Sequence, residues 1–156
     1  MQERDFEQLA VFTVGDAIKT AKVNRRRILL LLEQKVVDTS LPSAGRGNAR
    51  RFSFLDLVRV RIAADLERMG LAPRFLRKIL ARFTDLELAP TEKDDAPALA
   101  LISEAKRGFT VTFHSELTQT MAILAGEDIG AATISIRVPV RAITSEVRKG
   151  LGLRIG

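Results

Sequence analysis

The 156-residue chain contains no cysteine and a single histidine, His114. Disulfide bonds, thiolate metal sites and histidine-cluster metal sites are therefore excluded, as is any catalytic triad that needs another histidine. Trp and Tyr are also absent, which leaves only phenylalanine to stack on a nucleobase. The longest apolar run, 28–32, is far too short to cross a membrane, and residues 1–16 lack the apolar core of a signal peptide. We therefore expect a cytoplasmic protein with no membrane partner.

Positive charge is concentrated in one part of the chain. The whole chain carries 25 Lys and Arg against 19 Asp and Glu, a formal net charge of +6 at pH 7. Residues 19–61 alone hold 11 basic and 3 acidic residues, a net charge of +8, whereas residues 91–156 hold 8 of each. A positive field confined to one segment is typical of a polyanion-binding module joined to a neutral one.

Two short helices are predicted at the start of the basic segment. Thr13 is typical of a helix N-cap, with Asp16 in the first turn, and apolar residues then recur at helical spacing over 14–20. Asn24 is a second N-cap candidate, and we expect its helix to run to about Gln34. Two helices joined by about three residues predict a helix-turn-helix unit.

A β-hairpin wing is expected after these helices. Val36 and Val37 are a short strand candidate, and 49–52 is the candidate return strand. The loop between them, 41–48, contains one proline and two glycines, which favour a turn. The segment 36–52 is therefore predicted to be the wing.

Two further helices complete the predicted first half. Ser53 is expected to cap a third helix that ends at Gly70, and Pro73 to begin a fourth. Apolar residues at helical spacing are predicted to face the core: Leu55, Val58, Ile62, Leu66 and Met69 in the third helix, and Phe75, Leu76, Ile79, Leu80 and Phe83 in the fourth.

The second half is expected to form a separate small domain. Prolines and clustered charges over 84–97 indicate a linker. The order ββαβα is predicted beyond it, with strands at 98–102 and 109–113, a helix at 115–125, a strand at 132–138 and a helix that begins after Pro139. The expected fold class is therefore mainly α with α+β: a winged helix-turn-helix domain over 10–86 and a small α+β domain over 96–152.

Four motifs between positions 13 and 80 occur in the order and at the distances typical of one regulator family. They are Thr13-Val14-Gly15-Asp16-Ala17-Ile18-Lys19, Val23-Asn24-Arg25-Arg26-Arg27-Ile28, Arg50-Arg51-Phe52-Ser53-Phe54-Leu55-Asp56-Leu57 and Met69-Gly70-Leu71-Ala72-Pro73. On these motifs the first half of the chain resembles the MerR family of winged helix-turn-helix proteins. The resemblance implies double-stranded DNA as the ligand and the second helix as the recognition helix.

The sequence departs from the family pattern in several places. Family members usually carry paired tyrosines in the second helix, with an arginine before them and an acidic residue after them, and leucines occupy these positions, 29–32, in this chain. The acidic residue Glu33 comes one position after the usual place of the acid. Lys35 stands at the position of a usual glycine. Pro90 and the predicted strands stand where a typical member continues into a long dimerisation helix and an effector domain. The resemblance therefore implies DNA binding but not inducer sensing.

The second helix combines a polar first turn with an apolar remainder. Asn24, Arg25, Arg26 and Arg27 come first, and the apolar run 28–32 follows. Recognition helices present their N-terminal residues to base edges in the major groove and bury the rest. An arginine can donate two parallel hydrogen bonds to guanine, and Asn24 can pair with adenine unless it is used as a cap. Three consecutive arginines point in different directions around a helix, so we expect one or two on phosphates.

The tip of the predicted wing, Gly45-Arg46-Gly47-Asn48, places an arginine between two glycines. This arrangement lets the backbone approach a phosphate or lets Arg46 enter the minor groove. Arg50 and Arg51 follow on the return strand, where alternation turns one toward the DNA and the other toward the protein. The candidate DNA-binding residues are therefore Asn24, Arg25, Arg26, Arg27, Arg46, Arg50 and Arg51.

No pattern in the sequence indicates catalysis, a cofactor or a metal. His114 is more typical of a hydrogen-bonded surface or capping residue than of a catalytic one. Glu92, Asp94 and Asp95 lie in the proline-flanked linker, where carboxylates are usually solvated. We expect no enzyme activity, no cofactor and no metal.

These features predict a sequence-specific DNA-binding transcriptional regulator that acts as a homodimer. One helix-turn-helix unit buries little DNA surface, and most such readers double it by two-fold symmetry. The C-terminal domain is the candidate dimerisation module, through an edge of the strand at 132–138. Two alternatives stay open: a DNA-binding antitoxin whose C-terminal domain holds a small protein partner, and a phage or mobile-element DNA-architecture protein such as an excisionase or packaging subunit.

Overall fold

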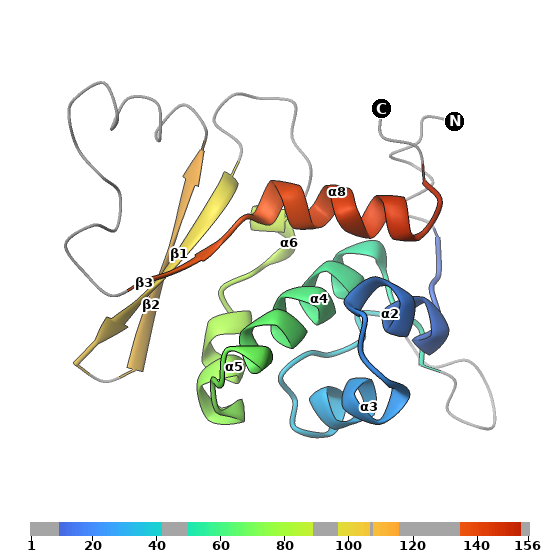
Figure 1. Ribbon diagram of the computed structural model, residues 1–156, viewed down its shortest axis with the longest axis horizontal. Coiled ribbons are helices and arrows are strands. Elements are labelled where there is room, and N and C mark those ends of the chain that lie inside the picture. Colours follow the sequence, from blue (N-terminus) through green and yellow to red (C-terminus); the bar gives the residue numbers. More distant parts are fainter. Residues whose placement is uncertain (1–9, 42–49, 89–96, 107, 116–134, 154–156) are drawn as a thin grey trace.

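A computed structural model describes residues 10–41, 50–88, 97–106, 108–115 and 135–153. These residues form a mixed α+β structure with six helices and a three-stranded antiparallel sheet, which confirms the predicted mixed class (Figure 1). The helices are α2 (Val14–Ala21), α3 (Arg25–Glu33), α4 (Phe54–Arg68), α5 (Pro73–Leu80), α6 (Asp85–Leu88) and α8 (Val140–Gly150). The strands are β1 (Pro97–Ala105), β2 (Gly108–Ser115) and β3 (Ser135–Val138).

Helices α2 and α3 begin at the two predicted caps. The Thr13 hydroxyl accepts a hydrogen bond from the Asp16 N–H, and the Asp16 carboxylate accepts one from the Thr13 N–H at 2.8 Å. The Asn24 Oδ1 atom accepts a hydrogen bond of 2.9 Å from the Arg27 N–H. Lys22 ends α2 in the left-handed region, at φ 56°. Each N-cap supplies an acceptor to the free N–H groups of a first helical turn.

The prediction of a strand at Val36 and Val37 is wrong. Helix α3 ends instead in a Schellman turn, in which Lys35 is left-handed at φ 54° and the Val36 N–H donates to the Leu31 carbonyl at 3.0 Å. Both valines are buried in the core beside α3 and α4. Their apolar character therefore reflects burial after a helix end and not a place in a sheet.

The return strand predicted at 49–52 is not found in its described residues, and it does not pair with 36–37: Phe52 forms only an isolated antiparallel bridge, with Phe12. The Phe12 N–H donates to the Phe52 carbonyl at 2.8 Å, and the Phe52 N–H donates to the Phe12 carbonyl at 2.9 Å. Both phenylalanines are buried. The segment 42–49, which includes the predicted wing tip, lies outside the described residues.

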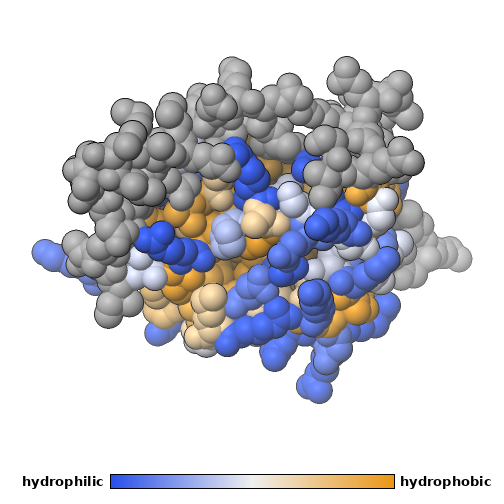
Figure 2. Space-filling model, turned by 45° about the horizontal axis from the view of Figure 1, so that its top comes forward, coloured by the Kyte–Doolittle hydropathy of each residue, from blue (hydrophilic) through white to orange (hydrophobic). Residues whose placement is uncertain are grey.

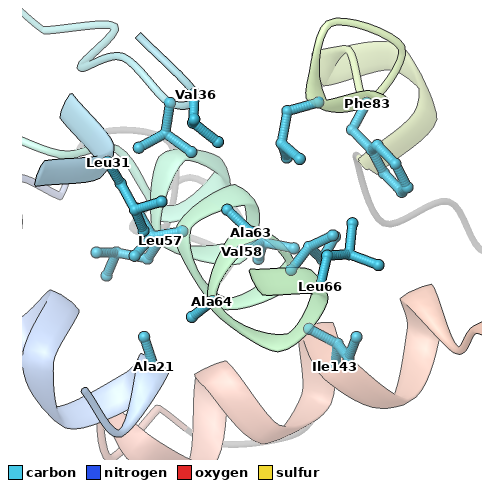
Figure 3. Packing of buried hydrophobic residues seen from close by; sticks show 14 of the residues in the cluster. Ala21, Leu31, Val36, Leu57, Val58, Ala63, Ala64, Leu66, Phe83 and Ile143 are labelled. Carbon is cyan, nitrogen blue, oxygen red and sulfur yellow. The ribbon is translucent and has the colours of Figure 1, made fainter. Parts of the chain in front are cut away.

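Helix α4 is the centre of the core and lies between α8 and α3 (Figures 1 and 3). Its predicted apolar stripe is confirmed at Val58, Ile62 and Leu66, which are all buried. Met69 is 60% exposed, contrary to the prediction, because α4 ends at Arg68 before the chain turns at Gly70. Further residues of α4 are buried on the remaining faces: Leu57, Val60, Ala63 and Ala64. A helix buried on so many sides needs cover from several neighbours.

Helix α5 begins at Pro73 as predicted, and the segment after it is more ordered than the sequence indicates. The predicted linker over 84–97 includes helix α6 at its start, where Leu88 is buried, and Pro97 already belongs to strand β1. Residues 89–96 lie outside the described part of the chain.

The sheet has the order β2-β1-β3, with every neighbouring pair antiparallel. The two strands predicted at 98–102 and 109–113 are confirmed and are longer than expected, and the strand predicted at 132–138 is described over Ser135–Val138. Edge-to-face contacts attach the sheet to the helices: Phe75 packs on Phe109, and Phe83 packs on Phe113. Of the helix predicted at 115–125, Ser115 belongs to β2 and 116–125 lies outside the described residues.

Helix α8 joins the two predicted domains in one core. Its buried residues Val140, Ile143 and Val147 belong to the same hydrophobic cluster as the buried residues of α2, α3 and α4 (Figure 3). Close to its end, a Cβ atom built on Gly150 would meet the Thr20 side chain at 3.4 Å, so α8 and α2 approach closely there. The apolar periodicity of α8 predicts a buried face, but the surface that covers this face could only be identified from the structure.

Candidate nucleic-acid interface

The first turn of α3 exposes two arginines with no partner among the described residues. Arg25 and Arg26 are solvent-exposed, and their side chains make no hydrogen bond or ion pair in the part of the chain that the structure describes. The first turn of α3 contains no acidic residue. Because the N-terminal end of a helix carries partial positive charge, arginines there are electrostatically unfavourable for the helix itself. Stabilisation of α3 therefore does not explain why arginines occupy positions 25 and 26.

Arg27 differs from its two neighbours because it pairs with helix α4. Its Nε atom lies 3.0 Å from Glu67 Oε1, and the Glu67 side chain is only 18% exposed. This ion pair links the first turn of α3 to the last turn of α4. Arg27 therefore has a structural partner that Arg25 and Arg26 lack in the described structure, and a base contact by its Nε atom would require the pair to break.

Asn24 is also partly committed to the fold. Its side-chain oxygen is the acceptor that caps α3. Bidentate recognition of adenine uses both the oxygen and the nitrogen of an asparagine amide, so it would compete with this cap. The Asn24 amide nitrogen is left to donate a hydrogen bond, for example to a phosphate oxygen.

The other predicted contact residues are divided by their exposure. Arg50 is exposed and its side chain has no partner among the described residues, whereas Arg51 is half-buried and does have one. Arg50 and Arg51 are not in a strand, so the prediction that alternation turns one of them toward DNA stays a prediction. Arg46 lies outside the described residues.

Two arginines of α4 hold the helices together and are not free to bind a ligand. Arg61 donates to Glu146 on α8 at 2.7 Å and pairs with Asp65 at 3.0 Å. Arg68 pairs with the same Asp65 at 2.6 Å and donates to the Ala21 carbonyl at 2.8 Å. Burial acts to lower the pKa of Arg61, but the charges and hydrogen bonds of Asp65 and Glu146 outweigh it, so the pKa is raised. Arg61 therefore stays charged.

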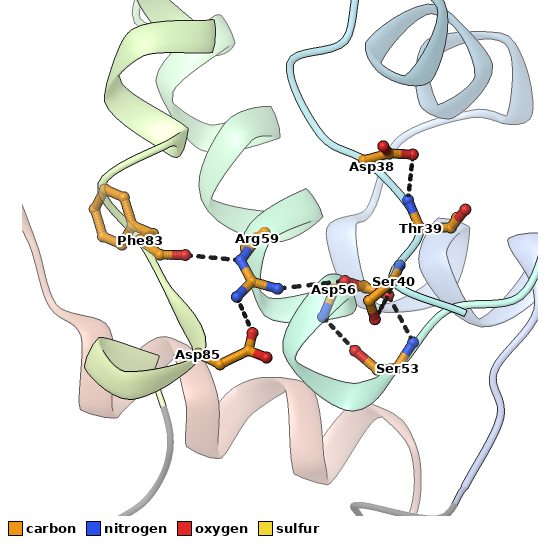
Figure 4. Close-up of polar contacts among 8 residues, drawn as sticks. All are labelled: Asp38, Thr39, Ser40, Ser53, Asp56, Arg59, Phe83 and Asp85. Carbon is orange, nitrogen blue, oxygen red and sulfur yellow. Dashed lines mark hydrogen bonds and ion pairs between the residues drawn. The ribbon is translucent and has the colours of Figure 1, made fainter. Parts of the chain in front are cut away.

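Arg59 belongs to a second structural network (Figure 4). Its guanidinium pairs with Asp56 and with Asp85, and it donates to the Phe83 carbonyl at 2.7 Å. Asp56 also accepts hydrogen bonds from the backbone N–H groups of Ser40 and Ser53, both at 2.9 Å. Part of the +8 charge of residues 19–61 is therefore neutralised inside the protein, and the exposed cations that remain are concentrated near α3.

The exposed cations near α3 include two that sequence reasoning did not single out. Lys19 and Lys22, on α2 and in the turn before α3, are both on the surface. The space-filling view shows many hydrophilic side chains on the right and lower part of the visible face, with apolar ones between them (Figure 2). The signal that could have found Lys22 is the turn itself, because the residue between two helices of such a unit is exposed.

The features that could indicate other functions are weak in the described residues. His114 Nε2 lies 3.1 Å from Thr112 Oγ1 on the surface of strand β2, as expected for a hydrogen-bonded surface histidine. Within the described ranges, no three His, Cys, Asp or Glu side chains are grouped so that they could bind a metal ion. Glu92, Asp94 and Asp95 lie outside those ranges. None of the described helices has the length and apolar character needed to span a bilayer.

Comparison with known proteins adds no family assignment. No protein-family model matches the chain, and no curated protein matches it either. The function of the protein is therefore inferred from its own residues and their arrangement.

Proposed function

We propose that this protein is a sequence-specific DNA-binding transcriptional regulator with a MerR-like winged helix-turn-helix domain in its first half. The observation that carries the proposal is the pair Arg25 and Arg26, exposed at the N-terminus of α3 and unpaired within the described structure. Their neighbours in the same basic segment, Arg27, Arg59 and Arg61, all have carboxylate partners. Two exposed cations at an unfavourable helix end are best explained by an anionic ligand.

The path of the backbone around α3 supports this proposal. Helices α2 and α3 are separated by three residues, 22–24, and Lys22 takes the left-handed conformation that a glycine often supplies in a helix-turn-helix turn. The buried residues of α3 are Ile28, Leu31 and Leu32, which follow its first turn. A helix buried in this way presents its N-terminal residues outward, as a recognition helix in the major groove does.

We further propose that the regulator is a homodimer that joins through strand β3. This strand is hydrogen-bonded to β1 on one side and forms an edge of the three-stranded sheet in the described residues. An exposed edge offers unpaired N–H and C=O groups that a second copy can use. Two-fold symmetry would place two α3 helices on one duplex.

The proposal is tested by DNA binding across a salt series. A duplex selected from a random pool is labelled, and its affinity for the full chain is measured by fluorescence anisotropy. If the protein neutralises about six phosphates, the slope of log affinity against log salt should be near −5. Affinity that hardly changes between low and physiological salt would contradict the proposal.

Point variants in α3 test the role of each arginine. Arg25→Ala and Arg26→Ala should each cost about 1–3 kcal/mol on the selected duplex and should relax its sequence preference. Arg27→Ala is the matched control, because its side chain is engaged by Glu67, and it should cost less binding free energy than either neighbour. Arg46→Ala should weaken binding to all sequences similarly. Equal losses on selected and random duplexes for every variant would contradict the assignment of Arg25 and Arg26 to base recognition.

A further inference from the structure

Helix α5 has a continuous basic face that the predicted site does not include. Arg74, Arg77 and Lys78 on α5 and Arg82 in the turn after it are all exposed. Arg74, Arg77 and Lys78 are spaced i, i+3 and i+4, which places them on one face of α5, and Arg82 follows in the turn. The opposite face is formed by the buried residues Leu76, Ile79 and Leu80. The result is a stripe of four cations, the α5 stripe, above an apolar face that is buried in the core.

No carboxylate in the described structure neutralises the α5 stripe. The four side chains make no ion pair or hydrogen bond there, and α5 itself contains no acidic residue. Like charges at i, i+3 and i+4 repel one another. The helix dipole disfavours Arg74 in the first turn, whereas it favours Arg77 and Lys78 in the last turn. The stability of α5 therefore does not account for Arg74 or for the clustering of the three cations.

The position of the first arginine is fixed by an aromatic pair. The Arg74 guanidinium lies 4.6 Å from the centre of the Phe75 ring, and Phe75 packs edge-to-face on Phe109 of strand β2 at 5.1 Å. A guanidinium stacked on a ring keeps its N–H edge available for hydrogen bonds while losing little further side-chain freedom. Arg74 is therefore arranged to donate to an oxygen-rich anion.

Helices α5 and α3 lie on the same side of α4, away from α8 (Figure 1). Helix α3 lies toward one end of this side, and α5 lies toward the other end beside the sheet. Arg74 and Lys78 are separated by four helical steps, a rise of about 6 Å, and Arg82 follows in the turn after α5. One strand of a duplex places a phosphate about every 3.4 Å along the duplex axis, so the stripe is long enough to meet more than one phosphate. A duplex engaged by α3 continues as a line of phosphates, so its backbone is an anionic partner of suitable length on that side.

We propose that the α5 stripe binds the phosphate backbone of the duplex whose bases α3 reads. The inference rests on the proposed function and extends it with a second, sequence-independent contact. Each cation of the stripe contacts phosphate oxygens and releases condensed counterions, so it adds to the salt dependence without changing sequence preference.

The test compares salt slopes of full-length variants on the selected duplex and on a random one. The triple variant Arg74→Gln, Arg77→Gln, Lys78→Gln should lower the magnitude of the slope by about 2.7, because each phosphate that is no longer neutralised lowers it by about 0.9. The ratio of the affinity of the unmodified chain to that of the triple variant should therefore fall about 40-fold as salt rises from 50 to 200 mM. The loss should be the same on both duplexes.

A matched pair of single variants separates the stripe from net charge. Lys78→Gln should lower the slope magnitude by about 0.9, whereas Lys149→Gln, an exposed lysine of α8 on the other side of α4, should leave it unchanged. Thermal melts by circular dichroism check that each variant is folded, and the substituted side chains are all solvent-exposed.

The outcomes distinguish this inference from the proposed function. If Arg25→Ala lowers affinity but the triple variant has the slope of the unmodified chain, the stripe does not bind DNA and the inference fails, while DNA binding by α3 stands. That same outcome is expected if the stripe instead binds an acidic protein. If the unmodified chain binds no duplex at any salt, the proposed function fails and the inference fails with it.

Discussion

Asp56 is the only buried acid among the described residues, and substitution of its carboxylate is a sharp test of the fold. Asp56 is 2% exposed. One oxygen accepts hydrogen bonds from the Ser40 N–H, the Ser40 hydroxyl and the Ser53 N–H at 2.7–2.9 Å, and the other lies 3.3 Å from Arg59 Nη1 (Figure 4). The carboxylate therefore joins the chain before the 42–49 segment, the chain after it and the first turn of α4.

The substitution Asp56→Asn keeps the shape of this side chain but removes its charge and half of its acceptors. Removing one partner of a buried charged pair costs about 3–5 kcal/mol. Arg59 keeps Asp85 and the Phe83 carbonyl as partners, so we expect the lower end of that range, about 3 kcal/mol. In a chain of this size, about 3 kcal/mol lowers the melting temperature by about 6–12 °C.

Urea unfolding followed by far-UV circular dichroism measures this loss. Asp38→Asn is the matched control, because Asp38 is exposed and accepts one hydrogen bond, from the Thr39 N–H at 2.8 Å. It should change the free energy of unfolding by less than about 0.5 kcal/mol. Ser40→Ala removes one hydrogen bond to Asp56 and should cost about 1 kcal/mol. An Asp56→Asn chain as stable as the Asp38→Asn chain would refute the reasoning.

Two further predictions concern a helix end and the sheet edge. Lys35→Gly should raise the free energy of unfolding by about 0.5–1 kcal/mol, because Lys35 is left-handed at φ 54°. The control Lys19→Gly, inside α2, should lower the free energy of unfolding by about 1 kcal/mol. A Lys35→Gly chain that is destabilised in urea unfolding would contradict this prediction. For the proposed dimer, light scattering should give twice the 17.2 kDa mass of one chain, and Leu30→Ala should leave this mass unchanged. Amide hydrogen exchange at Ser135–Val138 should slow as protein concentration rises. A mass of one chain at every concentration would rule out the dimer.

The parts of the fold that were predicted correctly depend on interactions within one helical turn. Thr13, Asn24 and Ser53 cap the helices that follow them, and Pro73 begins α5, because each signal acts on backbone groups two or three residues away. The strand predicted at Val36 and Val37 shows the limit of such local signals. Two adjacent valines indicate burial, but only the Schellman turn at Lys35 shows how they reach the core.

The candidate site was predictable only in part, because ion pairing depends on residues that are distant in sequence. Arg61 pairs with Glu146, which is 85 positions away, and Arg59 pairs with Asp85, which is 26 positions away. The sequence therefore could not separate these structural arginines from Arg25 and Arg26, which have no partner among the described residues. A charge count over 19–61 also stops before α5, so it misses the α5 stripe, although the i, i+3, i+4 spacing of its cations is visible in the sequence.

Helix α8 connects the sheet in the second half of the chain to the helices of the first half. Strand β3 ends at Val138, and only Pro139 separates it from α8. Helix α8 packs on α2 with the close approach of Gly150 to Thr20, and on α4 through the pair Glu146–Arg61. A second copy that pairs with β3 would therefore be connected, through one rigid helix, to α2 and hence to α3. In the proposed dimer the sheet edge would set the separation of the two α3 helices, which must match the roughly 34 Å between successive major grooves on one face of DNA.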